Sequence, residues 1–270
     1  MKITIIGAGN MGGAIARGLA QGSVFRENDI TVTARSQKRL DELKIANPAF
    51  NVTNDNADAV KGADIVVLAI KPWLLESVVT QVRASLDLQK QLIISVVAGV
   101  TFEDMARMLT NDDDRDGDAA GNPMLYRVIP NTAIAIRESM TLIASFNTTD
   151  EQDALVKQIF DEMGKTILIE ERLMGAGTAL CSCGIAYVFK YIQASMDAAI
   201  ELGFNADQAR EMVAQTVKGG ADVLLQNATM PQAEIYKVTT PGGITIKGLN
   251  EMDDAGFAAA VRRGIKASVK

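Results

Sequence analysis

Glycines near the N-terminus are the residues whose spacing most clearly predicts chemistry. An apolar run at residues 2–6 is followed at once by Gly7, Gly9 and Gly12, after which the pattern becomes helical. In a strand–turn–helix unit, Gly7 permits the tight turn, Gly9 lets the backbone approach a pyrophosphate, and Gly12 lets the helix lie close to the strand. Free backbone N–H groups at the positive end of the helix dipole would hold the phosphates. The stretch therefore predicts a dinucleotide-binding turn.

Glycine spacing alone has a second interpretation, a turn that needs small residues and binds nothing. The context favours the nucleotide. The glycines stand directly between a strand pattern and a helix pattern, and a second strand pattern at residues 30–34 follows at the expected distance. We therefore expect the binding site to be built on the first βαβ unit.

Histidine is absent from the whole sequence. Its absence excludes Ser-His-Asp and Cys-His nucleophilic sites, His-ligated zinc and an imidazole general base. The chemistry must then need little from protein side chains. Hydride transfer meets that requirement, because the cofactor carries the reactive group.

Two other groups of residues invite a metal interpretation. The acidic stretch at residues 111–122 lacks the closing glutamate of an EF-hand loop, so we interpret it as a solvated loop. Cys181 and Cys183 are separated by one residue, and no further soft ligand stands nearby. Free thiols acting as small buried fillers explain them better than a redox or metal pair. We expect no metal site.

Strand and helix patterns alternate from residue 1 to about 170, which is typical of an α/β fold. Strand patterns stand at residues 2–6, 30–34, 50–53, 64–70, 91–97, 125–129, 140–144 and 166–170. Helix patterns lie between them, and those at residues 101–104 and 149–152 begin with capping motifs. We expect a Rossmann-type doubly wound sheet in residues 1–170. An all-α domain should follow in residues 171–270, where no convincing strand pattern occurs.

Ligands of doubly wound sheets bind beyond the carboxyl ends of the strands. Arg35 and Ser36 follow the second strand, at the place where an NAD-specific site would have an acidic residue for the ribose 2′-hydroxyl. A cation there favours a 2′-phosphate, with Lys38 or Arg39 as further candidates behind it. We therefore expect NADPH as the cofactor and NADH as a weaker alternative. Ser36 could also cap the next helix, with the basic residues merely solvated.

Small residues follow two more strands and suit a flat cofactor that lies across the edge of the sheet. Lys71 could contact a phosphate or ribose, although a lysine before a helix is more often only solvated. The turn at residues 127–132 would face the nicotinamide. Besides Arg35 and Ser36, the cofactor residues expected from the pattern are Gly7, Gly9, Asn10, Met11, Gly12, Ala69, Lys71, Pro72, Ala98 and Gly99.

The composition is that of a soluble globular protein, with 48% hydrophobic and 22% charged residues among 270. A net charge of −6 argues against a nucleic-acid or anionic-membrane partner. The first apolar run is too short for a signal peptide, and we expect no stretch that approaches the roughly 20 apolar residues of a membrane span. These features predict a cytoplasmic protein that acts on a small molecule.

Residues 175–203 are apolar nearly all round, so a helix there must be buried on most sides. A helical domain of about 100 residues cannot easily enclose such a helix alone. We expect burial against a second copy of the chain, as a homodimer or a higher homo-oligomer. The alternative is a central helix wrapped by its own neighbours.

The sequence resembles the pyrroline-5-carboxylate reductase family. The resemblance is carried by residues 6–12, 64–72, 95–101, 127–132, 178–180, 184, 186–189, 215–219 and 240–245. It implies a Rossmann domain, a helical domain that dimerises by interlocking, and an active site between them. It also implies that Asn56 contacts the adenosine ribose and that Thr240, Gly242, Gly243 and Thr245 form a loop that binds the substrate.

Elementary chemistry agrees with the implied substrate loop. A Gly-Gly turn before a helix presents several backbone donors, as a small carboxylate requires. The neutral hydroxyl of Thr245 suits an imine nitrogen. Without the resemblance, an ordinary turn at a helix start would be the simpler interpretation.

The sequence departs from the family pattern at several positions. Cys181-Ser-Cys-Gly-Ile stands where the family usually has Ser-Gly-Ser-Gly-Pro, Ala133 replaces a proline, and Gln193 replaces a glutamate. The acidic stretch resembles an insertion. These departures bear on the substrate contacts of the helix that follows residue 180.

The function expected is NADPH-dependent reduction of 1-pyrroline-5-carboxylate to L-proline, with Thr245 and Thr240 as the catalytic residues. Two alternatives stay open. One is a hydroxyacid-type dehydrogenase, for which Lys190 is the one obvious base in the helical domain. The other is a non-catalytic NADPH-binding protein.

Overall fold

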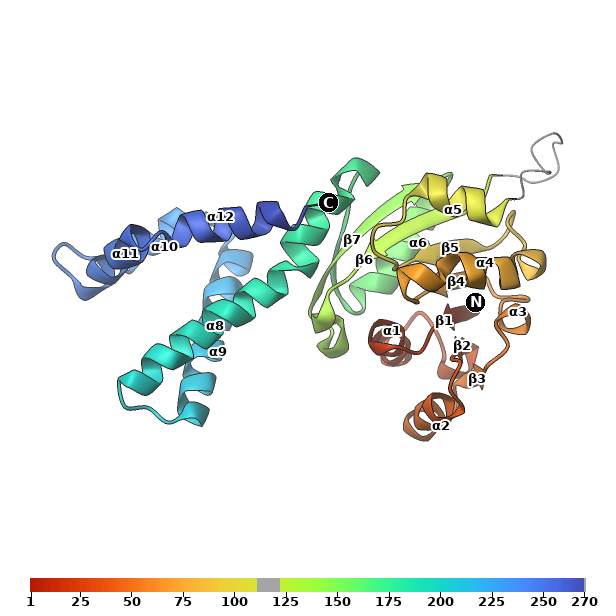
Figure 1. Ribbon diagram of the computed structural model, residues 1–270, viewed down its shortest axis with the longest axis horizontal. Coiled ribbons are helices and arrows are strands. Elements are labelled where there is room, and N and C mark those ends of the chain that lie inside the picture. Colours follow the sequence, from red (N-terminus) through yellow and green to blue (C-terminus); the bar gives the residue numbers. More distant parts are fainter. Residues whose placement is uncertain (111–121, 270) are drawn as a thin grey trace. The chain divides into compact units, whose positions relative to one another are not determined.

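The structure is a computed structural model that describes residues 1–110 and 122–269. These residues form two compact units, Met1–Ser182 and Cys183–Val269. The first unit contains the sheet and the second is helical (Figure 1). Of the acidic stretch at residues 111–122, only Asn122 lies within the described part of the chain.

The first unit is built around one sheet of eight strands with the order β3-β2-β1-β4-β5-β6-β7-β8. All neighbouring strands run parallel except β6 and β7, which are antiparallel. The order of the first six strands is that of a Rossmann fold. The strands are β1 (Ile3–Ile6), β2 (Ile30–Thr33), β3 (Asn51–Thr53), β4 (Ile65–Leu68), β5 (Leu92–Ser95), β6 (Met124–Ile129), β7 (Ser139–Phe146) and β8 (Gly164–Leu168).

Helices cover both faces of this sheet. Ile65 and Val67 of β4 belong to one buried apolar cluster, whereas Val66 and Leu68 belong to another. Successive side chains of a strand point to opposite faces, so the continuous apolar run predicts this double coverage. The helices of the unit are α1 (Asn10–Ala20), α2 (Gln37–Ala46), α3 (Asn56–Ala59), α4 (Leu75–Val82), α5 (Phe102–Leu109), α6 (Asp150–Asp161) and α7 (Met174–Gly177).

Strand register brings the turns after the central strands to one edge. Ile6 pairs with Thr33 on one side and with Leu68 on the other, and Leu68 pairs with Ser95. Each of these residues is the last of its strand. The residues that follow them therefore line the carboxyl edge, where doubly wound sheets bind ligands.

Two strands end earlier than their apolar patterns suggest. The runs at residues 64–70 and 91–97 predict longer strands, but β4 ends at Leu68 and β5 at Ser95. Ile70 and Val97 lie beyond these ends and pack against the core. Their apolar character reflects this packing, although the backbone at these two residues is no longer part of a strand.

Helix caps agree with the sequence in two places and differ in one. Thr101 with Asp104 and Thr149 with Gln152 form the expected capping boxes of α5 and α6. Ser36 precedes α2, but its side chain makes no capping hydrogen bond. Ser36 therefore holds the N-cap position of α2, as expected, but only its backbone contributes, and its exposed hydroxyl is available for another contact.

The second unit consists of helices alone within residues 183–269, which confirms the expected all-α character of the C-terminal region. Its boundary differs from the expected one, because residues 171–182 belong to the first unit. The helices are α8 (Gly184–Glu201), α9 (Ala206–Asn227), α10 (Pro231–Lys237), α11 (Ile244–Asp254) and α12 (Phe257–Ala267). Tyr191 of α8 packs edge-on against Phe257 of α12, with ring centroids 6.3 Å apart. Tyr187 also hydrogen-bonds Ser268.

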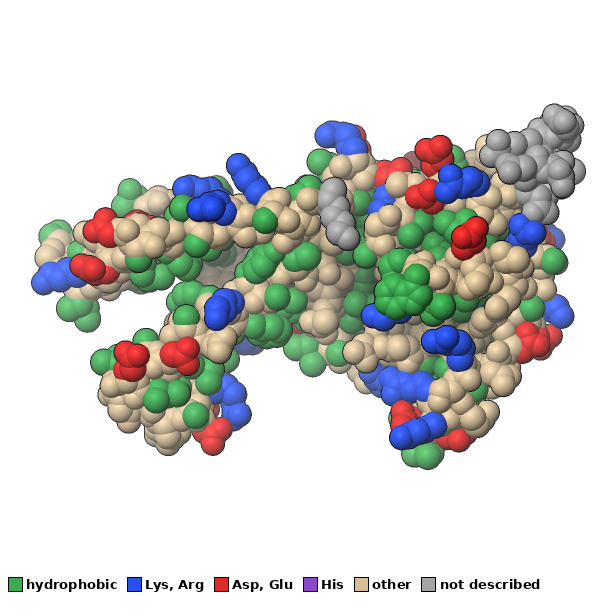
Figure 2. Space-filling view, in the orientation of Figure 1, with side chains coloured by type: hydrophobic (Ala, Val, Ile, Leu, Met, Phe, Trp, Pro, Cys, Tyr) green, Lys and Arg blue, Asp and Glu red, His purple; other side chains and the backbone are tan. Residues whose placement is uncertain are grey.

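Apolar side chains are widely exposed in this unit (Figure 2). Of its described residues only Ala209 is fully buried among the apolar ones. Large exposed side chains include Val188, Phe189, Tyr191, Ile200, Leu202, Phe204, Met212, Val223, Leu225, Met230, Tyr236, Val238 and Ile244. Exposed apolar area of this extent marks an interaction surface.

One helical run passes the length and composition test of a membrane span. Within Glu171–Glu201, a segment of 18 residues has a mean hydropathy of 1.3, and 11% of this segment is buried in the structure. The expectation that no stretch approaches a span is therefore wrong by that test. A helix that is apolar all round also occurs in the core of a soluble assembly, which passes the same test.

Candidate functional site

The turn after β1 shows why two of its glycines are required by the fold and one is not. Gly7 has a φ of +107°, and a Cβ there would stand 2.5 Å from the carbonyl oxygen of Ala69. A Cβ on Gly12 would stand 1.9 Å from the carbonyl oxygen of Gly7. A Cβ on Gly9 would meet nothing within 4 Å, and its φ is −69°. Because the protein itself does not need glycine at position 9, the open space there is room for a ligand.

The helix after this turn begins with free donors. α1 starts at Asn10, and no side chain caps it at Gly9. Its first turn contains no acidic residue. The N–H groups of Asn10 and Met11 therefore point out of the helix start, where the helix dipole favours an anion.

Basic side chains gather beside the same turn. Arg35 is exposed after β2, in line with the sequence. Arg39 lies in the first turn of α2, where it forms an ion pair of 3.0 Å with Glu42, and its Nε donates to the carbonyl oxygen of Ala8 over 2.8 Å. A Cβ on Gly13 would stand 3.3 Å from Arg17 Nη1 and 3.4 Å from Arg39 Nη2. Two guanidinium groups thus converge on the first turn of α1, which strengthens its attraction for an anion.

The sequence predicted Arg39 as a candidate behind Arg35, but it did not lead us to Arg17. One feature of the sequence nevertheless indicated Arg17. Gly13 is a fourth glycine that the turn motif does not require, and its missing side chain leaves the space in which the two guanidinium groups meet.

Asn56 lines a cavity at the carboxyl ends of β2 and β3. Its Oδ1 accepts a hydrogen bond of 2.6 Å from Thr33 Oγ1, and its Nδ2 donates to Gln81 Oε1 over 3.3 Å. The cavity measures about 500 Å³ and is lined by Asn54, Asp55, Asn56, Ala57 and Gln81. Gln81 is a second residue that sequence reasoning missed, because it comes from α4, 25 residues away in the chain.

The turns after β4 and β5 complete the edge. Ala69 donates its N–H to Ile6 and lies against Gly7, so this turn is fixed to the glycine turn. Lys71 is exposed and precedes Pro72, which begins a short 3₁₀ segment. Ala98 and Gly99 are exposed after β5, and Gly99 has a φ of +79°. A half-buried alanine and an exposed lysine therefore follow β4, and two small, exposed residues follow β5.

The loop implied as the substrate site lies in the second unit, at the start of α11. Gly242 has a φ of +73°, and the Gly243 N–H donates to the carbonyl oxygen of Thr240 over 2.9 Å. A Cβ on Gly243 would stand 2.6 Å from Thr240 Oγ1, so the tight loop needs glycine there. Gly243 caps α11 without a side-chain hydrogen bond, and the first turn has no acidic residue. Thr245 is exposed within that turn.

This loop has the same property as the glycine turn of the first unit. The helix start presents uncapped N–H donors beside small residues, an arrangement that accepts a carboxylate or phosphate. The alternative of an ordinary turn also accounts for the positive φ of Gly242 and for glycine at the N-cap, so the loop geometry alone does not distinguish the two interpretations.

Comparison with known proteins gives matches to both units. A family model described as pyrroline-5-carboxylate reductase dimerisation matches residues 171–270, and one described as NADP oxidoreductase, coenzyme F420-dependent, matches residues 2–99. The chain is 35% identical to pyrroline-5-carboxylate reductase 2 of Dictyostelium discoideum, over 100% of this chain and 91% of that protein. The chain belongs to the pyrroline-5-carboxylate reductase family. The expected family is thereby confirmed.

One further relative is much longer than this chain, and two others have solved structures. Pyrroline-5-carboxylate reductase 1 of D. discoideum is 36% identical, and the match covers 98% of this chain but 48% of that protein. The structure of the Coxiella burnetii enzyme has a TM-score of 0.88 at 30% identity, covering 99% and 96% of the two chains. That of the Plasmodium falciparum enzyme, solved with NADP bound, has a TM-score of 0.86 at 26% identity, covering 100% and 95%.

The segment that departs from the family pattern has an irregular backbone in this reductase. Residues Thr178–Ser182 form a π-helical turn between α7 and α8. Asn131 Nδ2 donates to the carbonyl oxygen of Cys181 over 3.3 Å. Cys181 packs against the apolar core, and burial raises the pKa of its thiol. A thiol that is harder to ionise supports the interpretation of Cys181 as a filler.

Proposed function

We propose that this reductase catalyses the NADPH-dependent reduction of 1-pyrroline-5-carboxylate to L-proline. The observation that carries the proposal is similarity over the whole of this chain to proteins named for that reaction, including one at 35% identity. The geometry is in keeping with it. One edge of the sheet has an anion-binding turn with open space at Gly9, and the helical unit has a second uncapped helix start at α11.

The proposed cofactor site uses backbone donors for the pyrophosphate and cations for the 2′-phosphate. The turn from Gly7 to Gly12 holds the pyrophosphate on the N–H groups of Asn10 and Met11. Arg35 and Ser36 contact the 2′-phosphate, so NADH, which lacks that group, binds more weakly. Asn56 contacts the adenosine ribose. The remaining contacts come from Ala69, Lys71, Pro72, Ala98 and Gly99.

The proposed substrate site is the loop before α11. The substrate carboxylate accepts hydrogen bonds from the free N–H groups of this helix start, with Gly242 and Gly243 allowing close approach. Thr245 orients the imine nitrogen through its hydroxyl, and Thr240 lies beside it on the loop. Neither contact requires an ionisable side chain.

The chemistry asks little of the protein beyond binding. NADPH, when bound, supplies a hydride to the carbon of the C=N bond, while the nitrogen gains a proton. With no histidine in the chain, the substrate enters partly as the protonated iminium, and Thr245 holds that nitrogen in place. The rate enhancement then comes mainly from orientation of the two reactants and exclusion of water.

The assembly proposed is a homodimer or higher homo-oligomer in the cytoplasm, with residues 171–270 as the dimerisation domain. The exposed apolar side chains of α8 and α9 support it, because a second copy would cover them. A hydroxyacid dehydrogenase gains no support from Lys190, which is exposed and whose hydrogen bond is to Gln193 over 3.5 Å.

Substitution of Thr245 tests the proposed substrate site. Thr245→Ala should lower kcat with pyrroline-5-carboxylate by roughly 10-fold or more, because a hydrogen bond to a charged group is lost. Thr245→Ser keeps the hydroxyl and is the matched control. The NADPH dissociation constant should stay the same in both variants. An unchanged kcat in Thr245→Ala would remove Thr245 from the mechanism.

A further inference from the structure

Arg127 is the first residue of the segment 127–132 that was expected to face the nicotinamide, and it is a buried cation within the sheet. It lies on β6, and its side chain is 10% exposed. Its Nη1 forms an ion pair of 2.7 Å with Glu171 Oε1, which is 35% exposed. Within the described residues its Nε is buried without a hydrogen-bond partner. A buried cation is costly unless it is paired, so the contact with Glu171 must outweigh an incomplete set of hydrogen bonds.

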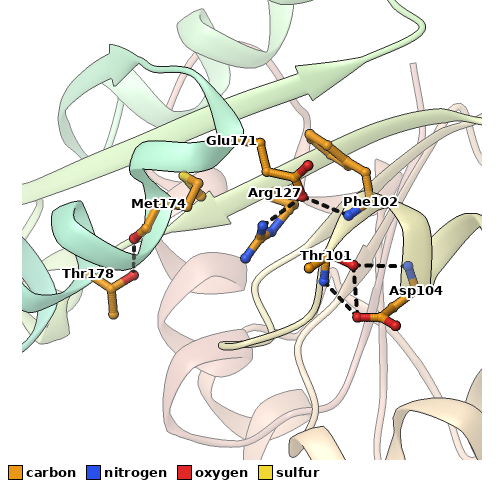
Figure 3. Close-up of polar contacts among 7 residues, drawn as sticks. All are labelled: Thr101, Phe102, Asp104, Arg127, Glu171, Met174 and Thr178. Atoms are coloured by element: carbon orange, nitrogen blue, oxygen red, sulfur yellow. Dashed lines mark hydrogen bonds and ion pairs between the residues drawn. The ribbon is translucent and has the colours of Figure 1, made fainter. Parts of the chain in front are cut away.

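The same carboxylate oxygen holds the start of α5. Glu171 Oε1 also accepts a hydrogen bond of 2.8 Å from the backbone N–H of Phe102, the first residue of that helix (Figure 3). Thr101 and Asp104 cap the same helix start through their own reciprocal hydrogen bonds. The carboxylate therefore binds a donor that the capping box leaves free.

These contacts fix both ends of the turn that follows β5. At its beginning, the Val97 N–H donates to Ser95 Oγ over 3.2 Å. Ser95 is the register partner of Arg127 on the neighbouring strand. At its end, Phe102 is bound to Glu171, which is bound to Arg127. Both ends of the turn are thus tied to the same place in the sheet.

Between these fixed ends lie Ala98 and Gly99, both exposed at the carboxyl edge. In this strand order, a dinucleotide whose 2′-phosphate lies beyond β2 and whose pyrophosphate lies beyond β1 extends its other half over β4 and β5. The turn after β5 is therefore on the nicotinamide side. Hydride transfer is sensitive to small displacements there, since a shift of about 1 Å can lower a rate about 100-fold.

We infer that Arg127 is a positioning residue for the nicotinamide end of the cofactor, acting through Glu171 on the turn that contains Ala98 and Gly99. The inference rests on the proposed function, because it assumes that the carboxyl edge binds NADPH. It assigns a role to the Arg127–Glu171 pair beyond stability. Neither residue touches the reacting atoms.

The test compares substitutions of this pair with a substitution in a surface ion pair of α5, the helix whose start Glu171 holds. Arg127→Met and Glu171→Gln remove one charge each, and Arg127→Lys keeps the charge. Arg107→Met is the control, since Arg107 pairs with Asp104 on the exposed side of α5 at 2.8 Å. Binding is read from the fluorescence of Trp73, the single tryptophan of the chain, which is 76% exposed in the segment after β4. The emission of bound NADPH reports the surroundings of the nicotinamide.

Arg127→Met and Glu171→Gln should each lower kcat by about 10-fold or more and change the emission of bound NADPH, because the turn shifts. The NADPH dissociation constant should change by less than about 3-fold, since the phosphates dominate binding. Arg127→Lys should recover part of kcat, and Arg107→Met should match the wild type. The double variant should be no slower than the slower single variant, as expected for residues that act through one contact.

A wild-type kcat in Arg127→Met would overturn the inference. If Arg127→Met does not fold, a wild-type kcat in both Glu171→Gln and Arg127→Lys would overturn it. Equal losses in kcat and in NADPH binding would overturn it as well. If the wild-type protein fails to reduce pyrroline-5-carboxylate, the proposed function is wrong. The NADPH emission of the variants then still decides whether Arg127 positions the nicotinamide.

Discussion

At the scale of single residues, Gly9 is a position where an effect on NADPH binding can be separated from an effect on stability. An alanine Cβ at this position meets no protein atom within 4 Å and the backbone there is ordinary, so Gly9→Ala should leave the melting temperature unchanged. The same methyl group would stand where the pyrophosphate approaches the backbone. We expect NADPH binding to weaken at least about 10-fold, as measured by fluorescence titration.

Gly12→Ala is the contrasting variant for this prediction. Its Cβ would clash with the carbonyl oxygen of Gly7, so this variant should lose stability as well as binding. Gly219→Ala is a matched control in the interior of α9, where a Cβ meets nothing within 4 Å. Tight NADPH binding by Gly9→Ala would show that the cofactor lies elsewhere.

The sequence predicted the residues that follow strands better than the residues that approach from helices. The glycine turn, Arg35 and the small residues after β4 and β5 are close in sequence to a strand end, so their position follows from topology. Arg39 was a candidate because it follows β2 closely, whereas Arg17 and Gln81 reach the same edge from helices. Only the extra glycine at position 13 hinted at Arg17, and no local pattern marked Gln81. Ion pairs such as Arg127 with Glu171 join residues 44 positions apart and could not be foreseen.

At the scale of elements, a buried polar network joins β6 and β7 to α6. Tyr126 is fully buried, and its hydroxyl donates to Asp153 Oδ1 over 2.8 Å. Ser145 and Thr148 also donate to the carboxylate of Asp153. Burial, together with the hydrogen bond to Asp153, raises the pKa of Tyr126 well above its ordinary value. The hydroxyl therefore stabilises the fold only while it is protonated.

Tyr126→Phe should lower the free energy of unfolding at neutral pH by about 1 kcal/mol, the typical value of one hydrogen bond. The sign of the pH dependence follows from the raised pKa. Above the unfolded pKa of about 10, the unfolded tyrosine loses its proton before the folded one does, so stability falls as pH rises. Urea unfolding between neutral pH and pH 11 should show a steeper fall for the wild type than for Tyr126→Phe.

Tyr236→Phe is the matched control, since Tyr236 is 69% exposed on α10. The free energy of unfolding of this variant should change with pH as that of the wild type does. Parallel curves for the wild type and Tyr126→Phe would contradict the assignment of the raised pKa.

The apolar patterns of the sequence predicted most strands of the sheet, because buried parallel strands produce continuous apolar runs. They did not foretell the antiparallel pairing of β6 with β7, since an apolar run carries no direction. The π-helical turn at Thr178–Ser182 was also missed. One extra residue in a helical turn would shift the phase of an apolar stripe, but residues 175–203 are apolar nearly all round, so there was no stripe in which the shift could be seen.

At the scale of the whole molecule, the exposed apolar faces of α8 and α9 predict self-association. Phe189 is 59% exposed on α8 in the single chain. Light scattering after gel filtration should give the wild type a mass of at least twice the 28.9 kDa of one chain. Phe189→Asp should shift it toward one chain mass, because a buried unpaired carboxylate is costly.

Ile45→Asp provides the control for self-association. Ile45 is 81% exposed on α2 of the first unit, away from the dimerisation region in sequence. This variant should keep the mass of the wild type. A wild-type mass equal to one chain would contradict the proposed assembly.

The most direct test of the proposed function is the oxidation of NADPH by the purified wild-type protein with 1-pyrroline-5-carboxylate, followed by absorbance and by identification of the product. We predict formation of L-proline in a 1:1 ratio to NADPH consumed, a slower reaction with NADH at equal concentration, and no reaction with hydroxyacids and NADP⁺. Tight NADPH binding without proline formation, or turnover of a hydroxyacid instead, would contradict it.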